Sequence, residues 1–200
     1  MSCETVSKRD QILRTAWRLF ESQGYHATGI NQIIKESGVP KGSFYHYFPE
    51  GKEGLAVEAI EAISEGISNK LDEVCTSQDD SVVAMAGMIR HIAQRLEETG
   101  YREGGPLTTV ALETATTNER INEACQQAYG KLHGVLAGHL EEDGFTPDDA
   151  AELSTTILAG IEGGILFSRT FHSTRPMEQL ARQLEETLTR QRNQAREQVT

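Results

Sequence analysis

The stretch Gly24–Phe48, GYHATGINQIIKESGVPKGSFYHYF, determines the fold class that we expect for this chain. Two short apolar segments meet within it at a tight turn, where Gly38 can take a positive φ without strain and Pro40 stops the first segment. Phe44 and Phe48 lie four residues apart, so a helix places them on one face and turns the residues between them outward. Two helices joined in this way form a helix-turn-helix, which presents polar side chains to the major groove of DNA.

Three helices are predicted around this turn. The first spans residues 7–23, where apolar residues recur every three or four positions. The second follows Thr28, whose hydroxyl is expected to cap the helix. Its apolar face, which includes Ile33, can be covered by Phe44 and Phe48 from the third. Three helices of this length bury little surface alone, so we expect them to lean on the chain that follows.

The charge of the chain is unevenly distributed. The 200 residues carry a net charge of −11. Residues 1–52 contain seven Lys or Arg and five Asp or Glu, a net charge of +2, whereas the remainder contains 12 and 25, a net charge of −13. Because an acidic body repels DNA, any DNA contact is expected to be confined to the N-terminal face.

Composition also bounds the compartment. We find no apolar run of about 18 residues and therefore expect no membrane span, and the N-terminus lacks the apolar core of a signal peptide. The three cysteines, Cys3, Cys75 and Cys125, are odd in number and far apart in sequence. This pattern favours reduced thiols in a cytoplasmic protein over a disulfide framework.

Beyond the turn, the hydrophobic pattern is helical almost throughout, and no segment shows the alternation of a strand. We therefore expect an all-α protein of about nine helices. Residues 1–51 are predicted to form a helix-turn-helix DNA-binding domain and residues 52–200 a helical-bundle domain for ligand binding and dimerisation. The later helices are expected at residues 52–75, 81–98, 107–115, 119–142, 148–171 and 176–196.

The first 55 residues resemble the TetR family of bacterial transcriptional regulators. Residues that match the family pattern in order are Gly24-Tyr25, Ala27-Thr28, Ile30, Ile33, Gly38-Val39, Gly42-Ser43, Tyr45, Phe48, Lys52-Glu53 and Leu55. Three residues separate Phe48 from Lys52, where the family commonly has two. This form, together with Gly105-Pro-Leu107 and Ile161-Glu-Gly-Gly164, resembles the subgroup typified by LmrA and YxaF. That likeness implies repression of multidrug-efflux or flavonoid-degradation genes.

The resemblance implies a repressor homodimer on a palindromic operator in double-stranded DNA, with one recognition helix in each major groove. Phosphate contacts, close backbone approach and base contacts are expected from Thr28, Asn31, Lys41, Gly42, Ser43, Tyr45, His46, Tyr47 and Lys52. Each has an ordinary alternative. A tyrosine ring can simply cover the core, a lysine can be a solvated surface charge, and Ser43 can cap a helix.

A helical bundle of this size can hold a small-molecule effector between its helices. The candidate lining residues are Ile63, Ile67, Met85, Met88, Ile89, Leu107, Val110, Glu113, Tyr129, His133, Ile161, Glu162 and Phe167. Glu113 and Glu162 lie in apolar runs, where burial of a charge is costly without a partner, so either can orient a hydroxyl or a cation. The alternative is that the apolar residues are plain core and the two glutamates are solvated or paired.

Small residues recur near the C-terminal end of the chain, where they permit close approach of another helix. The candidate homodimer interface comprises Ala159, Gly160, Gly163, Gly164 and Ser168. Glycines in a helix interior cost stability relative to alanine, so tight packing is a reason for them. A local kink is the alternative.

Other function classes lack a signature in this sequence. We find no metalloprotease, Walker or nucleophile-elbow motif and no paired histidines for a metal, and we expect no cofactor. A helical enzyme and an adaptor that retains the helix-turn-helix as a scaffold remain the alternatives, and a DNA binder without a ligand is a closer one. The leading prediction is a cytoplasmic, ligand-released repressor of efflux or catabolic genes that responds to a small amphipathic or aromatic molecule.

Overall fold

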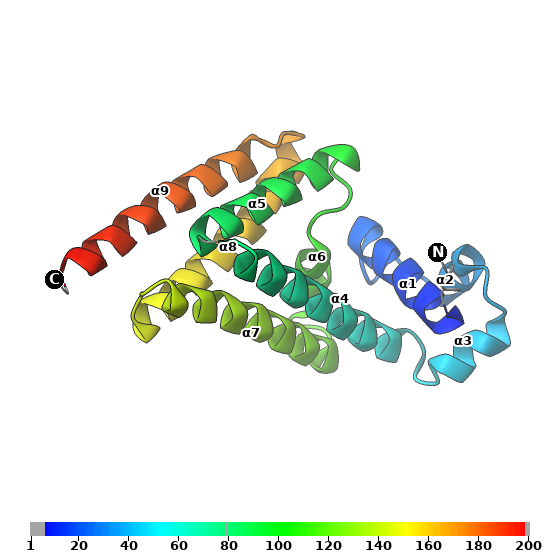
Figure 1. The fold of residues 1–200 in the computed structure, drawn as a ribbon. Coiled ribbons are helices and arrows are strands. Elements are labelled where there is room, and N and C mark those ends of the chain that lie inside the picture. The colour runs from blue at the N-terminus through cyan, green and yellow to red at the C-terminus, as the bar shows by residue number, and fades with distance from the viewer. Residues whose placement is uncertain (1–6, 79, 199–200) are drawn as a thin grey trace, which may run out of the picture. The chain divides into compact units, whose positions relative to one another are not determined.

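The residues that this computed structural model describes, 7–78 and 80–198, form nine α-helices and no strand (Figure 1). The all-α prediction is confirmed. The helices are α1 (Lys8–Gln23), α2 (Ile30–Ser37), α3 (Lys41–Tyr47), α4 (Gly51–Thr76), α5 (Ser81–Glu98), α6 (Pro106–Thr114), α7 (Glu119–Glu142), α8 (Pro147–Phe171) and α9 (Arg175–Gln198). Each begins and ends within two residues of its predicted position, because the apolar periodicity and the capping residues are local signals.

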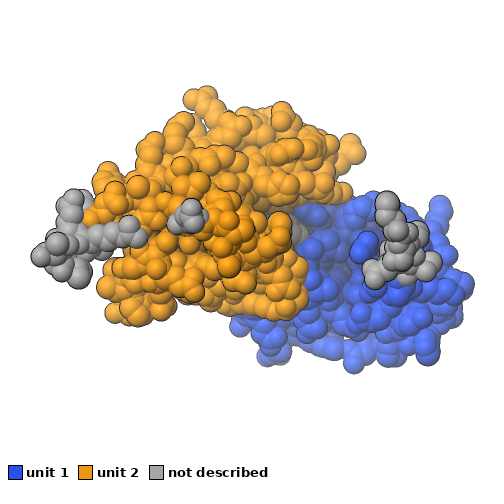
Figure 2. Space-filling view, in the orientation of Figure 1, with its two compact units in different colours: residues 1–63, 105–128 blue, residues 64–104, 129–200 orange. Residues whose placement is uncertain are grey.

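The described residues divide into two compact units (Figure 2). Unit 1 comprises residues 7–63 and 105–128, and unit 2 comprises residues 64–104 and 129–198. This division differs from the expected boundary between residues 51 and 52. Unit 1 also takes in α6 and the first parts of α4 and α7, because α1 packs against α6 and because Asn118 donates a 2.8 Å hydrogen bond to Glu53. Helices α1, α2 and α3 thus gain the additional packing that their small core requires.

The core of unit 1 is built on the predicted apolar faces of α1, α2 and α3. Phe20 of α1, Ile33 of α2 and Phe44 of α3 are each fully buried, and Phe48 retains 1% of its surface. The rings of Phe44 and Phe48 lie with their centroids 5.9 Å apart. Burying side chains of this size contributes about 1.5–3 kcal/mol each, so these residues hold α2 and α3 at a defined angle.

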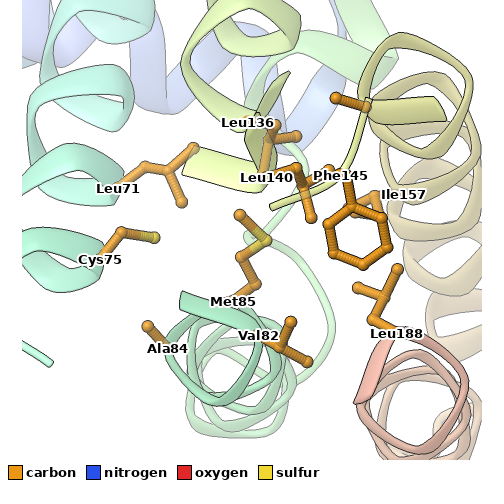
Figure 3. Close-up of a cluster of buried hydrophobic side chains, with 11 residues drawn as sticks. Leu71, Cys75, Val82, Ala84, Met85, Leu136, Leu140, Phe145, Ile157 and Leu188 are labelled. Atoms are coloured by element: carbon orange, nitrogen blue, oxygen red, sulfur yellow. The ribbon is translucent and has the colours of Figure 1, made fainter. Parts of the chain in front are cut away.

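Unit 2 has a core of two hydrophobic clusters within the packed helices α5, α8 and α9 and the parts of α4 and α7 that belong to it. Met85 extends from α5 into the first cluster, beside Leu140 and Phe145 (Figure 3). The first cluster contains Leu71, Cys75, Val82, Ala84, Met85, Leu136, Leu140, Phe145, Ala150, Ile157 and Leu188. The second contains Ala86, Ile89, Ala93, Leu96, Ile165, Met177 and Ala181.

Cys75 and Cys125 are buried free thiols. Burial raises the pKa of each to about 11, and near neutral pH both therefore remain protonated and unreactive. Cys3 lies outside the described residues.

A polar contact joins α9 to the start of α5. Asp80 caps α5 by accepting bonds from the backbone N–H groups of Val82 and Val83 at 3.0 and 3.2 Å. Its two carboxylate oxygens also accept from the guanidinium of Arg192 at 3.0 and 2.7 Å. The bonds with Arg192, more than those from the backbone, hold the pKa of Asp80 below its usual value.

Helix α8 is the one described helix whose length and mean hydropathy would suit a membrane span. The sequence argument looked for an unbroken apolar run and missed it, because polar residues such as Thr155, Thr156 and Glu162 interrupt the helix. A core helix of a soluble bundle passes the same test, and α8 contributes Ile157 and Ile165 to the core of unit 2.

Candidate functional site

The helix-turn-helix has the predicted geometry. Helix α2 ends at Ser37, the following Gly38 adopts the left-handed conformation with φ of 66°, and Pro40 immediately precedes α3. Glycine takes this conformation without the strain that a side chain adds. The turn is therefore sharp, and α3 leaves it in a new direction that is held by Phe44 and Phe48.

The two faces of α3 differ as the spacing predicts. Phe44 and Phe48 are buried, whereas Tyr45 keeps 44% of its surface exposed and Lys41 and His46 are also exposed. Tyr45 stands edge-on to Phe44 with ring centroids 5.2 Å apart, so its ring covers part of the core while nearly half of the residue stays exposed. Helix α3 thus carries amine, imidazole and phenol groups on an outward face.

The remaining predicted positions on or near α3 vary in exposure. Ser43 and Tyr47 are half-buried, and Asn31 and Gly42 are exposed. A Cβ placed on Gly42 would meet nothing within 4 Å. The backbone at Gly42 is therefore open to close approach by a partner.

Helices α2 and α3 each carry a lysine without an ion pair in the described part of the chain. Arg9 and Arg18 of α1 are paired with Glu58 and Glu36. Among the residues that the structure describes, Lys35 and Lys41 form no ion pair. An amine without an internal partner is available to a phosphate.

The structure corrects the predicted role of Thr28. Its side chain is fully buried, and its hydroxyl donates a 2.7 Å bond to the carbonyl oxygen of Gly24 while accepting one of 3.1 Å from Gln23. Gly29, not Thr28, is the residue that precedes α2, and it makes no side-chain cap. The hydroxyl therefore stabilises the turn between α1 and α2 and is not offered to DNA.

The ammonium group of Lys52 is likewise engaged inside unit 1. It donates bonds of 3.1 Å to the carbonyl oxygens of Tyr25 and Thr28 and lies 4.2 Å from the centre of the Tyr25 ring. Desolvation by burial lowers the pKa of Lys52, and the nearby carboxylate of Glu113 opposes this shift. Lys52 therefore does not extend as a freely solvated charge, and its first role is to hold the α1–α2 turn.

Glu113, a predicted ligand residue, has a bonding partner within unit 1. Glu113 lies in α6, and its carboxylate accepts a 2.8 Å bond from the backbone N–H of His26. Its backbone carbonyl oxygen lies 3.2 Å from the Nε2 atom of His26. The Glu113 side chain is thus paired within unit 1, as the alternative of a paired glutamate describes.

Five other predicted ligand residues lie in the core or on the surface. Leu107 and Val110 are buried in unit 1, and Met85 and Ile89 belong to the close-packed clusters of unit 2. Phe167 retains 56% of its surface on the outside of α8. Leu107, Val110, Met85 and Ile89 are thus residues of the hydrophobic core, the alternative given for them above. Phe167 is a surface residue.

A polar group in unit 2 joins α7 to α8 and contains predicted ligand residues. The phenol of Tyr129 donates a 2.9 Å bond to Glu162, and the Nε2 atom of His133 lies 2.9 Å from the carbonyl oxygen of Ala151. Ile161 packs against both hydrophobic clusters of unit 2. The remaining predicted positions, Ile63, Ile67 and Met88, are half-buried.

The small residues of α8 divide into an inward and an outward set. A Cβ on Gly160 would lie 2.9 Å from Leu180, and one on Gly164 would lie 2.5 Å from Met177, so both glycines face the chain's own α9. Ser168 is fully buried. Gly160 and Gly164 thus pack against a helix of the same chain, and the outward positions of α8 are those left for a second copy.

The outward residues of α8 include large apolar side chains that the predicted interface did not contain. A Cβ on Gly163 would meet nothing within 4 Å, and Ala159 is exposed. Leu166 and Phe171 are 51% and 68% exposed, and the ring centroids of Phe167 and Phe171 lie 6.0 Å apart. We call the set Ala159, Gly163, Leu166, Phe167 and Phe171 the α8 outer face. Large apolar side chains gathered on one surface mark an interaction site.

Sequence reasoning missed several structural contacts. The Asp80–Arg192 pair carried a partial signal, since an aspartate before the apolar run of α5 is a recognisable N-cap. The Glu113–His26 contact carried no signal, because 87 residues separate its partners. No group of three His, Cys, Asp or Glu in the described ranges is arranged to hold a metal ion.

Comparison with known proteins places these features in a family. Residues 12–59 match the family model described as bacterial regulatory proteins, tetR family, and residues 81–183 match the C-terminal domain of LmrA/YxaF-like transcriptional regulators. The uncharacterised regulator YxaF of Bacillus subtilis is 40% identical over 88% of this chain and 92% of its own length. The regulator LmrA of the same organism is 40% identical over 84% of this chain and 90% of its own length.

Solved structures share the fold. A TetR regulatory protein from Rhodobacter sphaeroides superposes with a TM-score of 0.80 at 22% identity, covering 90% of this chain and 97% of that one. A TetR regulator from Chloroflexus aurantiacus gives a TM-score of 0.78 at 25% identity, covering 91% and 94%. The matching families and relatives are transcriptional regulators and not enzymes. The chain therefore belongs to the TetR family of DNA-binding transcriptional regulators, with a C-terminal domain of the LmrA/YxaF-like type.

Proposed function

We propose that this protein is a cytoplasmic, ligand-released repressor that binds a palindromic operator as a homodimer. The observation that carries the proposal is the outward face of α3, where Lys41, Tyr45 and His46 are exposed above a core closed by Phe44 and Phe48. A hydrated, anionic duplex suits such a face, and a protein core does not.

The division of labour on DNA follows from reach and chemistry. Lys41 supplies an unpaired ammonium group to a phosphate, and the polar ends of Tyr45 and His46 approach phosphate oxygens. Ser43 reaches base edges, where a hydroxyl can donate or accept, and Gly42 leaves the backbone free to approach. Asn31 and Tyr47 flank these contacts.

Lys52 and Thr28 enter the proposal differently. Two bonds hold the Lys52 ammonium to the α1–α2 turn, and a third N–H remains for a phosphate. The groups of Thr28 stay internal, since its backbone N–H donates a 3.2 Å bond to Tyr25 and its hydroxyl is already bonded.

A second copy of the chain is the partner that we propose for the α8 outer face. Leu166, Phe167 and Phe171 are exposed together on a helix whose opposite side builds the core. An isologous contact places the same apolar face on both protomers and relieves the exposure of all three side chains. Homodimers are typical of the family, which supports the choice of partner.

The proposed effector is a small amphipathic or aromatic molecule that binds within the helices of unit 2. The bonded pair Tyr129–Glu162 supplies polar orientation, and Ile161 and Met88, which both pack against the first hydrophobic cluster, supply apolar contact. Efflux or catabolic genes are the proposed targets, since their products remove such molecules.

Release follows from a shift between dimer forms. An effector that binds better to a form with wrongly spaced recognition helices lowers operator affinity by its differential affinity for the two forms. Helix α4 is a candidate route, because one continuous helix contributes residues to both units.

Footprinting on the DNA that flanks the protein's own gene tests the proposal, with and without a metabolite extract. We expect one protected, palindromic segment that loses protection when the extract is added. Duplex selected by the protein from a random library should contain the same palindrome. Protein that selects no duplex sequence contradicts the DNA-binding proposal, and an operator that no amphipathic compound releases contradicts the effector.

A further inference from the structure

The turn between α1 and α2 is held from two sides by residues distant in sequence. On one side, the Lys52 ammonium bonds the carbonyl oxygens of Tyr25 and Thr28 at 3.1 Å. On the other, the carboxylate of Glu113 accepts the backbone N–H of His26 at 2.8 Å. A cation on the carbonyl side and an anion on the N–H side match the polarity of the peptide groups. The turn is therefore clamped between α4 and α6.

Gly24 shows how closely the carboxylate approaches. Gly24 has a φ of 92°, and a Cβ added to it would lie 2.0 Å from the Oε1 atom of Glu113. Any side chain at this position would displace the carboxylate, and positive φ would strain it as well. The glycine and the glutamate thus form a matched pair, with one carboxylate oxygen against Gly24 and the other on His26.

The turn leads directly into the DNA-reading helices. Helix α2 begins at Ile30, two residues after Thr28, and α3 follows α2 after a short turn. Helix α1 packs against α6 as well as against α2 and α3. A shift of the turn relative to α6 therefore moves the start of α2, and the packed Ile33, Phe44 and Phe48 carry the shift to α3.

We propose that Glu113 is a positioning residue for operator binding, whose carboxylate holds the α1–α2 turn on α6 and so sets the orientation of α2 and α3. This inference rests on the proposed operator binding and adds to it a residue of α6 that lies outside the helix-turn-helix. We call the contact of Glu113 with Gly24 and His26 the Glu113 clamp.

The direction in which loss of Glu113 changes operator affinity distinguishes a positioning role from a purely electrostatic one. Removal of an acid from a DNA-binding unit weakens its repulsion of phosphates and, taken alone, strengthens binding. Loss of the Glu113 clamp instead frees the turn and lowers the fraction of molecules with α3 correctly oriented. A hydrogen bond to a charged group stabilises by an amount that limits the loss to about 10- to 100-fold in affinity.

The experiment uses full-length protein and duplex selected by the wild type from a random library, with affinity measured by fluorescence anisotropy at two salt concentrations. We expect Glu113→Ala to bind about tenfold more weakly, with the wild-type salt slope, since no phosphate contact is lost. Glu113→Gln keeps an acceptor oxygen and should recover part of the loss. Glu123→Ala is the charge-matched control, because Glu123 is an exposed acid of unit 1 without an internal partner among the described residues.

Hydrogen exchange of the segment 24–28 reports on the clamp without DNA. Glu113→Ala should exchange faster there than the wild type and Glu123→Ala, while the thermal unfolding midpoint changes little. In a double-mutant cycle, Gly24→Ala should cost less affinity in the Glu113→Ala background than in the wild type, since the carboxylate clash is gone. The φ strain at residue 24 is common to both backgrounds and cancels.

Two results overturn the inference. One is an affinity of Glu113→Ala equal to or higher than that of the wild type, as expected of Glu123→Ala. The other is unchanged exchange at residues 24–28, whatever the affinity. If the wild type selects no duplex, the proposed function fails, and the exchange measurement still decides whether Glu113 holds the turn.

Discussion

Helices α3 and α8 each present an exposed face, and the two faces have opposite chemistry. Helix α3 in unit 1 exposes Lys41, Tyr45 and His46, whereas α8 in unit 2 exposes Leu166, Phe167 and Phe171. Both helices bury apolar residues on their other side. The difference indicates two kinds of partner, since charged and hydrogen-bonding groups suit a hydrated polyanion and clustered phenylalanines suit a protein surface.

The largest expected effect comes from placing a charge on the α8 outer face. Phe167→Asp should convert the dimer to monomer, because an unpaired carboxylate is costly in an apolar interface. Operator affinity should fall about 100-fold or more, since the two half-sites are no longer bound together. Analytical ultracentrifugation and anisotropy measure the two effects.

The matched control is Val83→Asp. Val83 is an exposed apolar residue, 41% exposed, in the first turn of α5 and outside the α8 outer face. An acid is favourable in the first turn of a helix, so this variant should remain dimeric. A Phe167→Asp protein that is still a dimer at micromolar concentration would remove the α8 outer face from the interface.

The next effect concerns the support behind α8. Asp80→Ala should destabilise unit 2 by about 2–3 kcal/mol, because the α5 cap is lost and the mostly buried Arg192 keeps only its longer, 3.5 Å contact with Asp143. The pKa of Asp80 is lowered in the folded state from the ordinary value of 3.8. The stabilisation is therefore present above about pH 4 and lost as pH falls through the lower folded value.

Urea denaturation between about pH 3 and pH 7 tests this expectation, because these limits lie on either side of the ordinary pKa of an aspartate. The difference between wild type and Asp80→Ala should narrow toward the acid end. Asp148→Ala provides a control, since Asp148 is an exposed acid in the first turn of α8 without an internal partner among the described residues. A difference that stays constant across this range would show that ionised Asp80 contributes nothing specific.

Adjacent glycines of α8 allow a smaller and more local test of its two sides. Gly164→Ala should cost about 1–2 kcal/mol in unfolding free energy, because the added Cβ displaces Met177. Gly163→Ala meets nothing within 4 Å. In the monomeric Phe167→Asp background it should therefore gain up to about 1 kcal/mol from helix propensity.

The same pair distinguishes inward from outward packing in the dimer. Gly163→Ala should weaken association if the outer face is the interface, while Gly164→Ala should affect unfolding first. Thermal unfolding and sedimentation on both variants measure this contrast. Equal effects of the two substitutions on both quantities would contradict the assignment of sides.

The smallest effect is expected on the polar face of α3. Lys41→Ala should weaken binding to all duplexes alike by about three- to tenfold, with a salt slope smaller by about one unit. Lys70→Ala is the control, since Lys70 is an exposed lysine of unit 2 paired with Glu73. If Lys41→Ala instead changes the preference among operator variants, the lysine reads bases.

The secondary-structure elements were predicted correctly where the sequence pattern that indicates them is short-range. The positions of the nine described helices, the left-handed Gly38 and the two faces of α3 follow from spacing and capping residues. The capping role of Thr28 was wrong although it too concerned a local signal. Its hydroxyl donates to the carbonyl oxygen of Gly24 and does not accept from a backbone N–H at the start of α2.

Site predictions were less accurate where they depended on long-range partners. Glu113 was expected at a ligand and is bonded to His26, and Phe167 was expected inside and is exposed. Gly160 and Gly164 were assigned to a second copy and face α9 of the same chain. The glycines correctly indicated close packing, and Glu113 correctly indicated a polar partner. The residue type did not indicate which segment supplies the contact.

The sequence by itself determined the helices, the helix-turn-helix and the outward chemistry of α3, because helical periodicity orients side chains without reference to the rest of the chain. Only the tertiary structure decided that Glu113 and Lys52 hold the α1–α2 turn and that α8 turns its glycines inward and its phenylalanines outward. Those outcomes depend on which segments meet after the chain has packed. Short-range patterns carry no information about that choice, since it is made by the combined burial and hydrogen bonding of residues far apart in sequence.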